Sequence, residues 1–532
     1  MTLIAAPART RLYADPEGKF VHNVVLEECR KRGEKTAIVD TSWTPYRRVT
    51  YAEYGDLVER TASGFVAAGV RPGDMIGIYL PNCWEFGVAF HAAMLAGATP
   101  TTMNPTYRDR EVHYQMETSE AVALVSDGPL LQGINLSGLP ALRNVYAVRD
   151  ASCAGTEPLS NLYTYQSTAS LPQSERDPRL TIATLPFSSG TTGLPKGVML
   201  SHHNIVTNVY QTLTSGETGS IGVNDTILCF LPMYHIYGLT VGLNVALMCG
   251  CTLVFMPRFD CESSLRIAVE EDVTVNLCVP PALLAYCHAA EQGKFPRDHH
   301  MRWAKCGGAP LGAELARRFM ENTGIPIRQG YGMTEASPVT HMGYLDPEYY
   351  RAESIGGPVA LTECKVLDEN CNQVPAGELG ELVMRGPQIM LGYFKSPEAT
   401  DAVLRDGWYW SGDVVRVDEQ GLYYVVDRRK EMMKYRGFSV APAEVEGVLL
   451  EHPAVRDCGV VSRVDGEGEE IPCAFIVLRN GFFETDETRT SLREFVGERL
   501  CHYKMPREVL YVQSIPRTPS GKILRRDLRK LF

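Results

Sequence analysis

Short apolar strands alternate with amphipathic helices along most of this chain, and that alternation constrains its fold more than any other feature. Residues 51–69 carry apolar side chains at helical spacing, residues 75–80 form a short apolar run, and residues 84–96 return to the helical spacing. The same order of strand and helix recurs at 121–126, 226–231, 252–256 and 302–305. Such alternation is typical of an α/β fold with mostly parallel strands, in which ligand-binding loops follow the carboxyl ends of the strands.

The pattern changes near residue 380. Residues 380–385 and 421–426 predict short strands of a β-rich subdomain, and a compact tail follows the charged run 427–430. In this tail the periodicity predicts helices at 442–450 and 490–500 and strands at 455–461 and 473–478. We therefore predict an α/β protein whose large N-terminal domain, residues 1–429, contains layered α/β subdomains plus the β-rich subdomain. A small α+β C-terminal domain, residues 430–532, follows it.

The composition excludes several classes of protein. Of the 532 residues, 45% are hydrophobic and 22% are charged, which excludes a disordered or collagen-like chain. The formal net charge is −11, whereas general nucleic-acid binders usually carry a basic balance, so we expect no nucleic-acid partner. The 15 cysteines contain no C-x-x-C pair, which argues against a zinc ribbon or a disulfide framework and favours reduced thiols in a cytosol.

No segment of the sequence predicts a membrane or targeting role. The longest apolar runs are broken by His, Gly or Asn and fall below the ~20 residues needed to span a bilayer. The first residues form too short an apolar run for a signal peptide, and the last three are not a Ser-Lys-Leu peroxisomal signal. We expect a cytoplasmic protein without a membrane span.

The strongest chemical signal is a loop of small and hydroxyl residues. Four hydroxyl side chains, three glycines and one lysine fall within residues 188–197. Glycines let backbone N–H groups approach phosphate oxygens, hydroxyls add donors, and a lysine adds positive charge. It is not a Walker A motif, because Pro195 precedes Lys196 and Gly197 follows it. A flexible linker is the alternative, but the strand-like flanks favour a phosphate loop. Its candidate residues are Ser188, Ser189, Gly190, Thr191, Thr192 and Lys196.

This loop resembles the phosphate loop of the adenylate-forming superfamily, which includes acyl-CoA synthetases, adenylation domains of nonribosomal peptide synthetases and beetle luciferases. The match covers about residues 20–530, and further motifs follow in the family's order. Within the superfamily the chain is most similar to 4-coumarate–CoA ligases and bacterial aryl- or acyl-CoA ligases. The resemblance implies two half-reactions. A carboxylate attacks the α-phosphorus of Mg·ATP to give an acyl-adenylate and pyrophosphate, and the thiol of CoA then takes the acyl group and releases AMP.

The resemblance assigns catalytic roles to five residues. His235 would lie near the acyl carboxylate, Thr334 would bond a phosphate, and Glu335 would bind Mg²⁺. Lys522 would bridge the carboxylate and the α-phosphate in the first step, and Lys434 would serve the second. From the residues alone three alternatives remain: a core histidine for His235, a tight turn for Thr334 and Glu335, and a solvated charge run for Lys434.

The resemblance also assigns contacts to the nucleotides. Asp413 would accept hydrogen bonds from the ribose hydroxyls, Arg428 would contact ribose or phosphate, and the C-terminal domain would be mobile about a hinge at Lys430. The other residues matched to the family's ATP and CoA sites are Gln329, Gly330, Tyr331, Arg436, Gly437 and Arg258.

The acyl pocket of the family is matched by a mixture of aromatic, apolar and small residues. These are Tyr237, Val241, Lys305, Gly308, Gly332, Pro338, Val339 and Met342. The glycines leave room for a flat ring, and no acidic residue stands among them to pair an amino acid's ammonium group. Val241, Cys306 and Ser337 depart from the plant pattern. An aryl or hydroxycinnamic acid and a medium-chain fatty acid both remain open as substrates.

Three functions are therefore compared. The first is an ATP-dependent carboxylic acid–CoA ligase, and the second is a stand-alone adenylation enzyme that loads a carrier protein. The third is a nucleotide-binding scaffold without catalysis. The joint presence of Lys196, Thr334, Glu335, Asp413 and Lys522 argues against the scaffold, and no carrier domain is attached, which favours free CoA.

Overall fold

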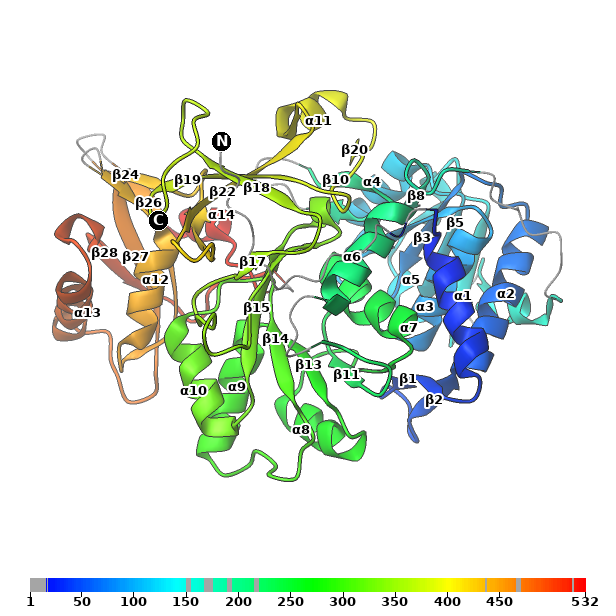
Figure 1. Cartoon of the computed structure of the whole chain (residues 1–532), viewed down its shortest axis with the longest axis horizontal. Helices are drawn as coiled ribbons and strands as arrows, with labels where there is room; N and C mark the ends of the chain where they lie inside the picture. The colour runs from blue at the N-terminus through cyan, green and yellow to red at the C-terminus, as the bar shows by residue number, and fades with distance from the viewer. Residues whose placement is uncertain are drawn as a thin grey trace.

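Two largely parallel sheets share a layer of helices and make up most of the molecule (Figure 1). The computed structural model describes residues 16, 18–149, 155–166, 176–188, 194–214, 220–435, 438–465, 470–518 and 521–532. The first sheet has nine strands in the order β17-β16-β15-β14-β13-β11-β12-β1-β2, and the second has five parallel strands in the order β4-β3-β5-β6-β7. In the first sheet the run from β15 to β1 is parallel, which confirms the fold class predicted from the alternation.

The strands of both sheets are short. Those of the first are β1 (Thr36–Asp40), β2 (Arg47–Thr50), β11 (Thr226–Cys229), β12 (Thr252–Phe255), β13 (Val275–Cys278), β14 (Trp303–Cys306), β15 (Ile327–Gly332), β16 (Val339–Met342) and β17 (Gly357–Pro358). Those of the second are β3 (Met75–Tyr79), β4 (Thr99–Met103), β5 (Ala123–Asp127), β6 (Asn144–Val148) and β7 (Glu157–Pro158). Strands β13 and β14 are buried along their whole length, as expected for parallel strands covered on both faces.

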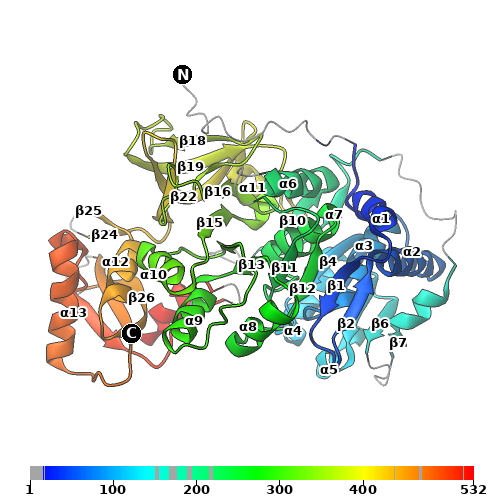
Figure 2. The same cartoon turned by 60° about the horizontal axis from the view of Figure 1, so that its bottom comes forward.

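Helix α3 (Trp84–Leu95) lies between the two sheets, because it contacts β1 of the first and both β3 and β4 of the second. Ten of its twelve residues are buried, and a helix that is buried nearly all round is typical of an interior position. The other helices of this layer are α1 (Val21–Arg32), α2 (Tyr51–Ala67), α6 (His202–Thr214) and α7 (Val245–Cys249). On the other side of the nine-stranded sheet lie α8 (Cys261–Glu270), α9 (Pro280–Glu291) and α10 (Ala313–Thr323), as Figure 2 shows.

A third region is rich in antiparallel strands, as the sequence predicted from residue 380 onward. It pairs β18 (Glu363–Leu367), β19 (Leu379–Arg385), β22 (Trp408–Val417) and β21 (Leu404–Arg405) in that order, with β23 (Tyr423–Arg428) on β22. A smaller sheet joins β20 (Gly392–Tyr393), β10 (Lys196–Ser201) and β8 (Ile182–Thr184), with β9 (Phe187–Ser188) on β10. Outside these sheets lie α4 (Asp109–Ser119), α5 (Gly128–Leu131) and α11 (Pro397–Val403).

The C-terminal residues form a separate sheet at one end of the molecule (Figure 1). It contains β26 (Val455–Val464), β27 (Glu470–Leu478) and β28 (Glu508–Tyr511), packed with α12 (Pro442–Glu451), α13 (Asp486–Arg499), α14 (Arg525–Leu528) and the hairpin of β24 (Met433–Tyr435) and β25 (Phe438–Val440). Helix α13 begins before the predicted residue 490, because the Thr485 side chain accepts a hydrogen bond from the Thr488 N–H and caps an acidic first turn. Over the described ranges, no helix is both long and apolar enough to cross a membrane.

A buried hydrogen-bond chain ties α2, α3 and the segment after β11 together. The Tyr54 hydroxyl lies 2.7 Å from His91 Nδ1, and His91 Nε2 lies 3.0 Å from the Asn244 side-chain oxygen. Burial lowers the pKa of His91 to about 4, so the folded protein holds this ring neutral.

We predict that this neutral histidine makes stability depend on pH. Below the ordinary histidine pKa, His91 of the unfolded chain binds a proton, whereas His91 of the folded protein binds one only near pH 4. The contribution of His91 to the free energy of unfolding is therefore fully present above the ordinary pKa and decreases as the pH falls from that value to about 4. For each such histidine the free energy of unfolding should fall by about 1.4 kcal/mol per pH unit near pH 5.

Chemical denaturation at several pH values measures this slope. The H91Q variant should have a shallower slope than the parent, by roughly the contribution of one proton. The H300Q variant, which changes an exposed histidine beside Asp272, should keep the parent slope. An unchanged slope in H91Q would contradict the prediction.

Candidate functional site

The end of β15 approaches its neighbours more closely than a side chain would allow. A Cβ atom on Gly332 would lie 1.9 Å from the Pro338 carbonyl oxygen, so only glycine fits there. This contact folds the chain back from β15 through the turn Thr334–Ala336 into β16. Thr334 and Glu335 are therefore held at the carboxyl end of a parallel strand, where the sequence predicted a site.

Asp413 joins this strand end to the β-rich region. Its carboxylate is buried, accepts a hydrogen bond from the Tyr331 hydroxyl of β15, and lies 3.1 Å from Arg428 Nε of β23. The strand pairing of Asp413 with Arg428 places the two side chains side by side. Asp413 raises the pKa of Arg428, and burial together with Asp413 raises the pKa of Tyr331 well above its usual value. The cluster is a charged pair with an aromatic ring, suited to hydroxyl and phosphate groups.

Glu335 presents a carboxylate to the same space. Its Oε1 accepts a 2.9 Å hydrogen bond from the Tyr393 hydroxyl, and its backbone oxygen accepts one from the Met390 N–H. In the described parts of the chain, no group of three or more His, Cys, Asp or Glu side chains is placed to hold a metal ion. One carboxylate fits an ion that takes its other ligands from water and from a ligand's phosphate oxygens, as Mg²⁺ does.

Lys522 reaches this site from the C-terminal region. It lies close enough to interact with Arg428, Asp413 and Glu335, and its loop is held by a 2.8 Å hydrogen bond from Arg517 to the Gly521 carbonyl. Lys522 keeps an exposed surface, but neighbouring protein partly desolvates its ammonium group and lowers the pKa of Lys522. Arg428 lowers the pKa further, and the two carboxylates oppose the shift.

His235 lies close enough to Lys522 for the two side chains to interact. Burial, with a contribution from Lys522, lowers the pKa of His235 to about 4, and its Nδ1 accepts a hydrogen bond from the Tyr237 N–H. At neutral pH the ring is a neutral hydrogen-bonding group rather than a cation.

The predicted acyl-pocket residues gather around Tyr237 and Lys305. Tyr237 begins a π-helix, Tyr237–Asn244, that also contains Val241, and its hydroxyl donates to the Lys305 carbonyl at 3.2 Å. The Lys305 Nζ lies 5.9 Å from the centre of the Tyr237 ring. Gly332, Pro338, Val339 and Met342 come from β15, the following turn and β16, and Gly308 follows β14 with φ of +80°. π-Helical turns are frequent at functional sites, and nothing in the sequence predicted this one.

Lys305 is an unusual residue for a protein interior. Its side chain is 2% exposed, and within the part of the chain that the structure describes its Nζ has no hydrogen-bond partner. Burial lowers the pKa of Lys305 well below its usual value, and Arg328 on the neighbouring strand lowers it further. Two basic groups therefore lie beside the predicted acyl pocket, and the guanidinium of Arg328 lies over the Trp303 ring, 4.3 Å from its centre.

The remaining predicted residues differ in where they lie. Gln329 bonds the backbone of Leu311 and Ala352 and so supports the loop, and the Cβ of a residue at Gly330 would lie 2.7 Å from the Lys305 side chain. Ser188 ends β9, Lys196 starts β10, and Lys430 is exposed. The predicted residues Ser189, Gly190, Thr191, Thr192, Arg436 and Gly437, and the side chain of Lys434, lie outside the described residues.

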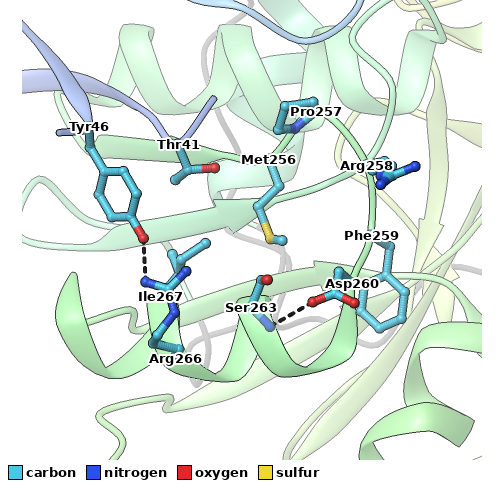
Figure 3. A pocket seen from close by; sticks show the side chains of 10 residues that line it. All are labelled: Thr41, Tyr46, Met256, Pro257, Arg258, Phe259, Asp260, Ser263, Arg266 and Ile267. Atoms are coloured by element: carbon cyan, nitrogen blue, oxygen red, sulfur yellow. Dashed lines mark hydrogen bonds between the residues drawn. The ribbon is translucent and has the colours of Figure 1, made fainter. Parts of the chain in front are cut away.

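Arg258 lies apart from this cluster. It lines a cavity of about 510 Å³ between the end of β12 and α8 (Figure 3). The cavity also presents Arg266, whose guanidinium donates to the Tyr46 hydroxyl, and Asp260, which caps α8 through the Ser263 N–H. The full lining is Thr41, Tyr46, Met256, Pro257, Arg258, Phe259, Asp260, Ser263, Arg266 and Ile267.

Two residues near the site were missed by sequence reasoning. Tyr393 contacts Glu335 from a strand about sixty positions later in the chain. Arg328 of β15 is the strand partner of Lys305 of β14. Arg328 directly precedes Gln329, which the resemblance assigns to the ATP and CoA sites, and that position is a usable signal. Nothing around Tyr393 in the sequence has the spacing of a chemical motif.

Family models match two parts of the chain. One described as AMP-binding enzyme matches residues 25–394, and one described as AMP-binding enzyme C-terminal domain matches residues 444–522. A 4-coumarate–CoA ligase 5 from Oryza sativa subsp. japonica is 36% identical, over 98% of this chain and 96% of its own.

Solved structures confirm the fold. A benzoate CoA ligase from Burkholderia xenovorans LB400 aligns with a TM-score of 0.86 at 27% identity, over 96% of this chain and 100% of its own. The anthranilate CoA ligase AuaEII in complex with anthranoyl-AMP aligns with a TM-score of 0.88 at 24% identity, over 97% of this chain and 98% of its own.

We predict that Lys305 costs stability. A buried donor without a partner is destabilising by about 1–3 kcal/mol, so K305M should raise the free energy of unfolding by roughly that amount. Chemical denaturation measures the change. The matched variant K504M removes a lysine that bonds Glu444 at 2.7 Å and should leave stability unchanged or lower it. A K305M protein less stable than the parent would refute the prediction.

Proposed function

We propose that this chain activates planar aryl acids. The chain belongs to the AMP-binding enzyme family and is an ATP-dependent acid–CoA ligase that acts through an acyl-adenylate. The observation that carries the choice of acid is the acyl pocket, where the Tyr237 ring packs against Gly307 and Lys305 has no carboxylate beside it among the described residues. The relatives support it, because their names refer to 4-coumarate and benzoate.

In the proposed first half-reaction the protein supplies position and charge rather than a nucleophile. Asp413 accepts hydrogen bonds from the ribose hydroxyls, and Arg428 and Lys522 lie beside the α-phosphate. Negative charge grows at that phosphate as the acid's carboxylate attacks, so fixed cations there lower the barrier. Neutral His235 and Thr334 hydrogen-bond to the acid and the phosphate.

We propose that Glu335 binds the Mg²⁺ ion that accompanies ATP. When bound, the ion neutralises part of the charge on the phosphates and orients them. Lys196 and the loop from Ser188 to Thr192 would bind the β- and γ-phosphates of ATP. The remaining proposed nucleotide contacts are Gln329, Gly330 and Tyr331.

The second half-reaction uses CoA in this proposal. Arg258 and the cavity that it lines would receive the phosphates of CoA. We place the domain boundary at Arg429/Lys430, because the C-terminal residues have a hydrophobic cluster of their own. Rotation about Lys430 would then withdraw Lys522 and bring Lys434, Arg436 and Gly437 to the adenylate.

A panel of acids tests the proposed substrate class. Pyrophosphate release should require ATP, Mg²⁺ and a carboxylic acid, and cinnamic or benzoic acids should exceed both medium-chain fatty acids and amino acids. An amino acid's ammonium group would be buried without a partner, which is costly. Faster turnover of fatty acids would overturn the aryl assignment, and preferential activation of an amino acid would overturn the pocket interpretation. Product formation with a carrier protein but not with CoA would favour the carrier-loading alternative.

Two lysine variants should separate the half-reactions. K522A should slow pyrophosphate release on the order of a hundred- to thousandfold, because one electrostatic contact to the transition state is lost. Supplied with preformed acyl-adenylate, K522A should still form the thioester. K434A should release pyrophosphate normally but convert adenylate to acyl-CoA slowly. Loss of the same half-reaction in both variants would contradict the rotating arrangement, as would normal activity of K434A.

A further inference from the structure

Tyr393 touches both the candidate metal carboxylate and the lysine of the phosphate loop. Its hydroxyl donates to Glu335 Oε1 at 2.9 Å. The face of its ring lies under the Lys196 ammonium, with Nζ 5.4 Å from the ring centre. The side chain is half-buried, so part of each interaction is shielded from water.

The backbone around Tyr393 is joined to the same two elements. Strand β20 pairs with β10, with Tyr393 opposite Val198, two residues after Lys196. The Phe394 N–H donates to the Gly197 carbonyl and the Leu391 N–H to the Met199 carbonyl, at 2.8 and 2.9 Å. On the other side, the Met390 N–H donates to the Glu335 carbonyl at 2.8 Å. This short segment therefore links the strand after the phosphate loop to the turn that carries Glu335.

The backbone of Tyr393 is held by a further hydrogen bond. Its N–H donates to the Thr400 hydroxyl at 2.8 Å, and Thr400 in turn bonds the Ser396 carbonyl at the start of α11. A side chain carried by an anchored backbone can fix the direction of its hydroxyl, which a tyrosine on a loose loop could not do.

We propose that Tyr393 is a positioning residue that fixes the Glu335 carboxylate relative to the Lys196 ammonium, so that Mg²⁺ and the phosphates of ATP bind as one unit. This inference rests on the magnesium role proposed for Glu335. The hydroxyl bonds one oxygen of the Glu335 carboxylate, and the other oxygen would remain available to a bound ion. The ring would limit the positions that the Lys196 ammonium can take, so that it could meet the phosphates of ATP.

The Y393F variant isolates the hydroxyl, because it keeps the ring under Lys196. Isothermal titration with ATP, in excess Mg²⁺ and in EDTA, measures how much the ion strengthens nucleotide binding and needs no acid substrate. Because a hydrogen bond to a charged acceptor is stronger than one to a neutral group, the increase in ATP affinity that Mg²⁺ causes should be about tenfold smaller in Y393F than in the parent. Binding in EDTA should match the parent.

A matched control lies in the β-rich region. The Tyr424 hydroxyl donates to an Asp418 carboxylate oxygen, also at 2.9 Å, and this pair belongs to no part of the candidate site. Y424F removes the same kind of bond and should bind ATP like the parent in both titrations. The Y393L variant removes the ring as well, and it should weaken binding in EDTA too, because Lys196 loses its support.

The outcomes separate this inference from the function on which it rests. If the parent itself gains nothing from Mg²⁺, the magnesium role of Glu335 fails. If the parent gains and Y393F gains equally, Tyr393 has no positioning role. Equal weakening of Y393F with and without Mg²⁺ would show a merely structural residue and would also overturn the inference.

Discussion

The buried carboxylate of Asp413 is the interaction on which the arrangement of the site depends. A carboxylate that is only 4% exposed must be paired, and its two partners come from different sheets, Tyr331 from β15 and Arg428 from β23. Satisfying this one group fixes the β-rich region against the carboxyl end of the parallel sheet. The same end carries Glu335 on the turn after β15, so the proposed nucleotide contacts share one support.

Positive charge is concentrated at the site of a protein whose formal net charge is −11. Arg428 and Lys522 lie at the proposed phosphate position, and Lys305 and Arg328 lie beside the proposed acyl pocket. Groups of like charge repel one another and lose solvation, which lowers stability in the empty protein. Binding of an anionic substrate relieves that repulsion, so the same charges that lower the stability of the empty protein increase its affinity for the anion.

Polar contacts join the C-terminal region to the end of β23, and its hydrophobic clusters are separate from the large one. Arg525 of α14 lies 3.8 Å from Asp427, whose carboxylate also accepts a hydrogen bond from the Ala443 N–H at 2.9 Å. Inside the region, Arg525 bonds Glu446 of α12 at 2.8 Å and Arg529 bonds Glu431. Polar contacts can be exchanged at low cost, whereas a shared apolar core cannot, so this docking is compatible with the rotation proposed about Lys430.

The sequence alone determined the α/β class, the order of the elements and the motif residues, because periodicity and local spacing carry that information. It also placed Asp413, Glu335 and Lys522 in one site through resemblance. Tertiary structure decided what surrounds them: the Tyr393 hydroxyl on Glu335, Arg328 beside Lys305, and the π-helix that begins at Tyr237. These contacts join residues far apart in the chain, or depend on packing that overrides local preference. No pattern along the sequence encodes which strand end faces which, because burial in three dimensions sets that choice.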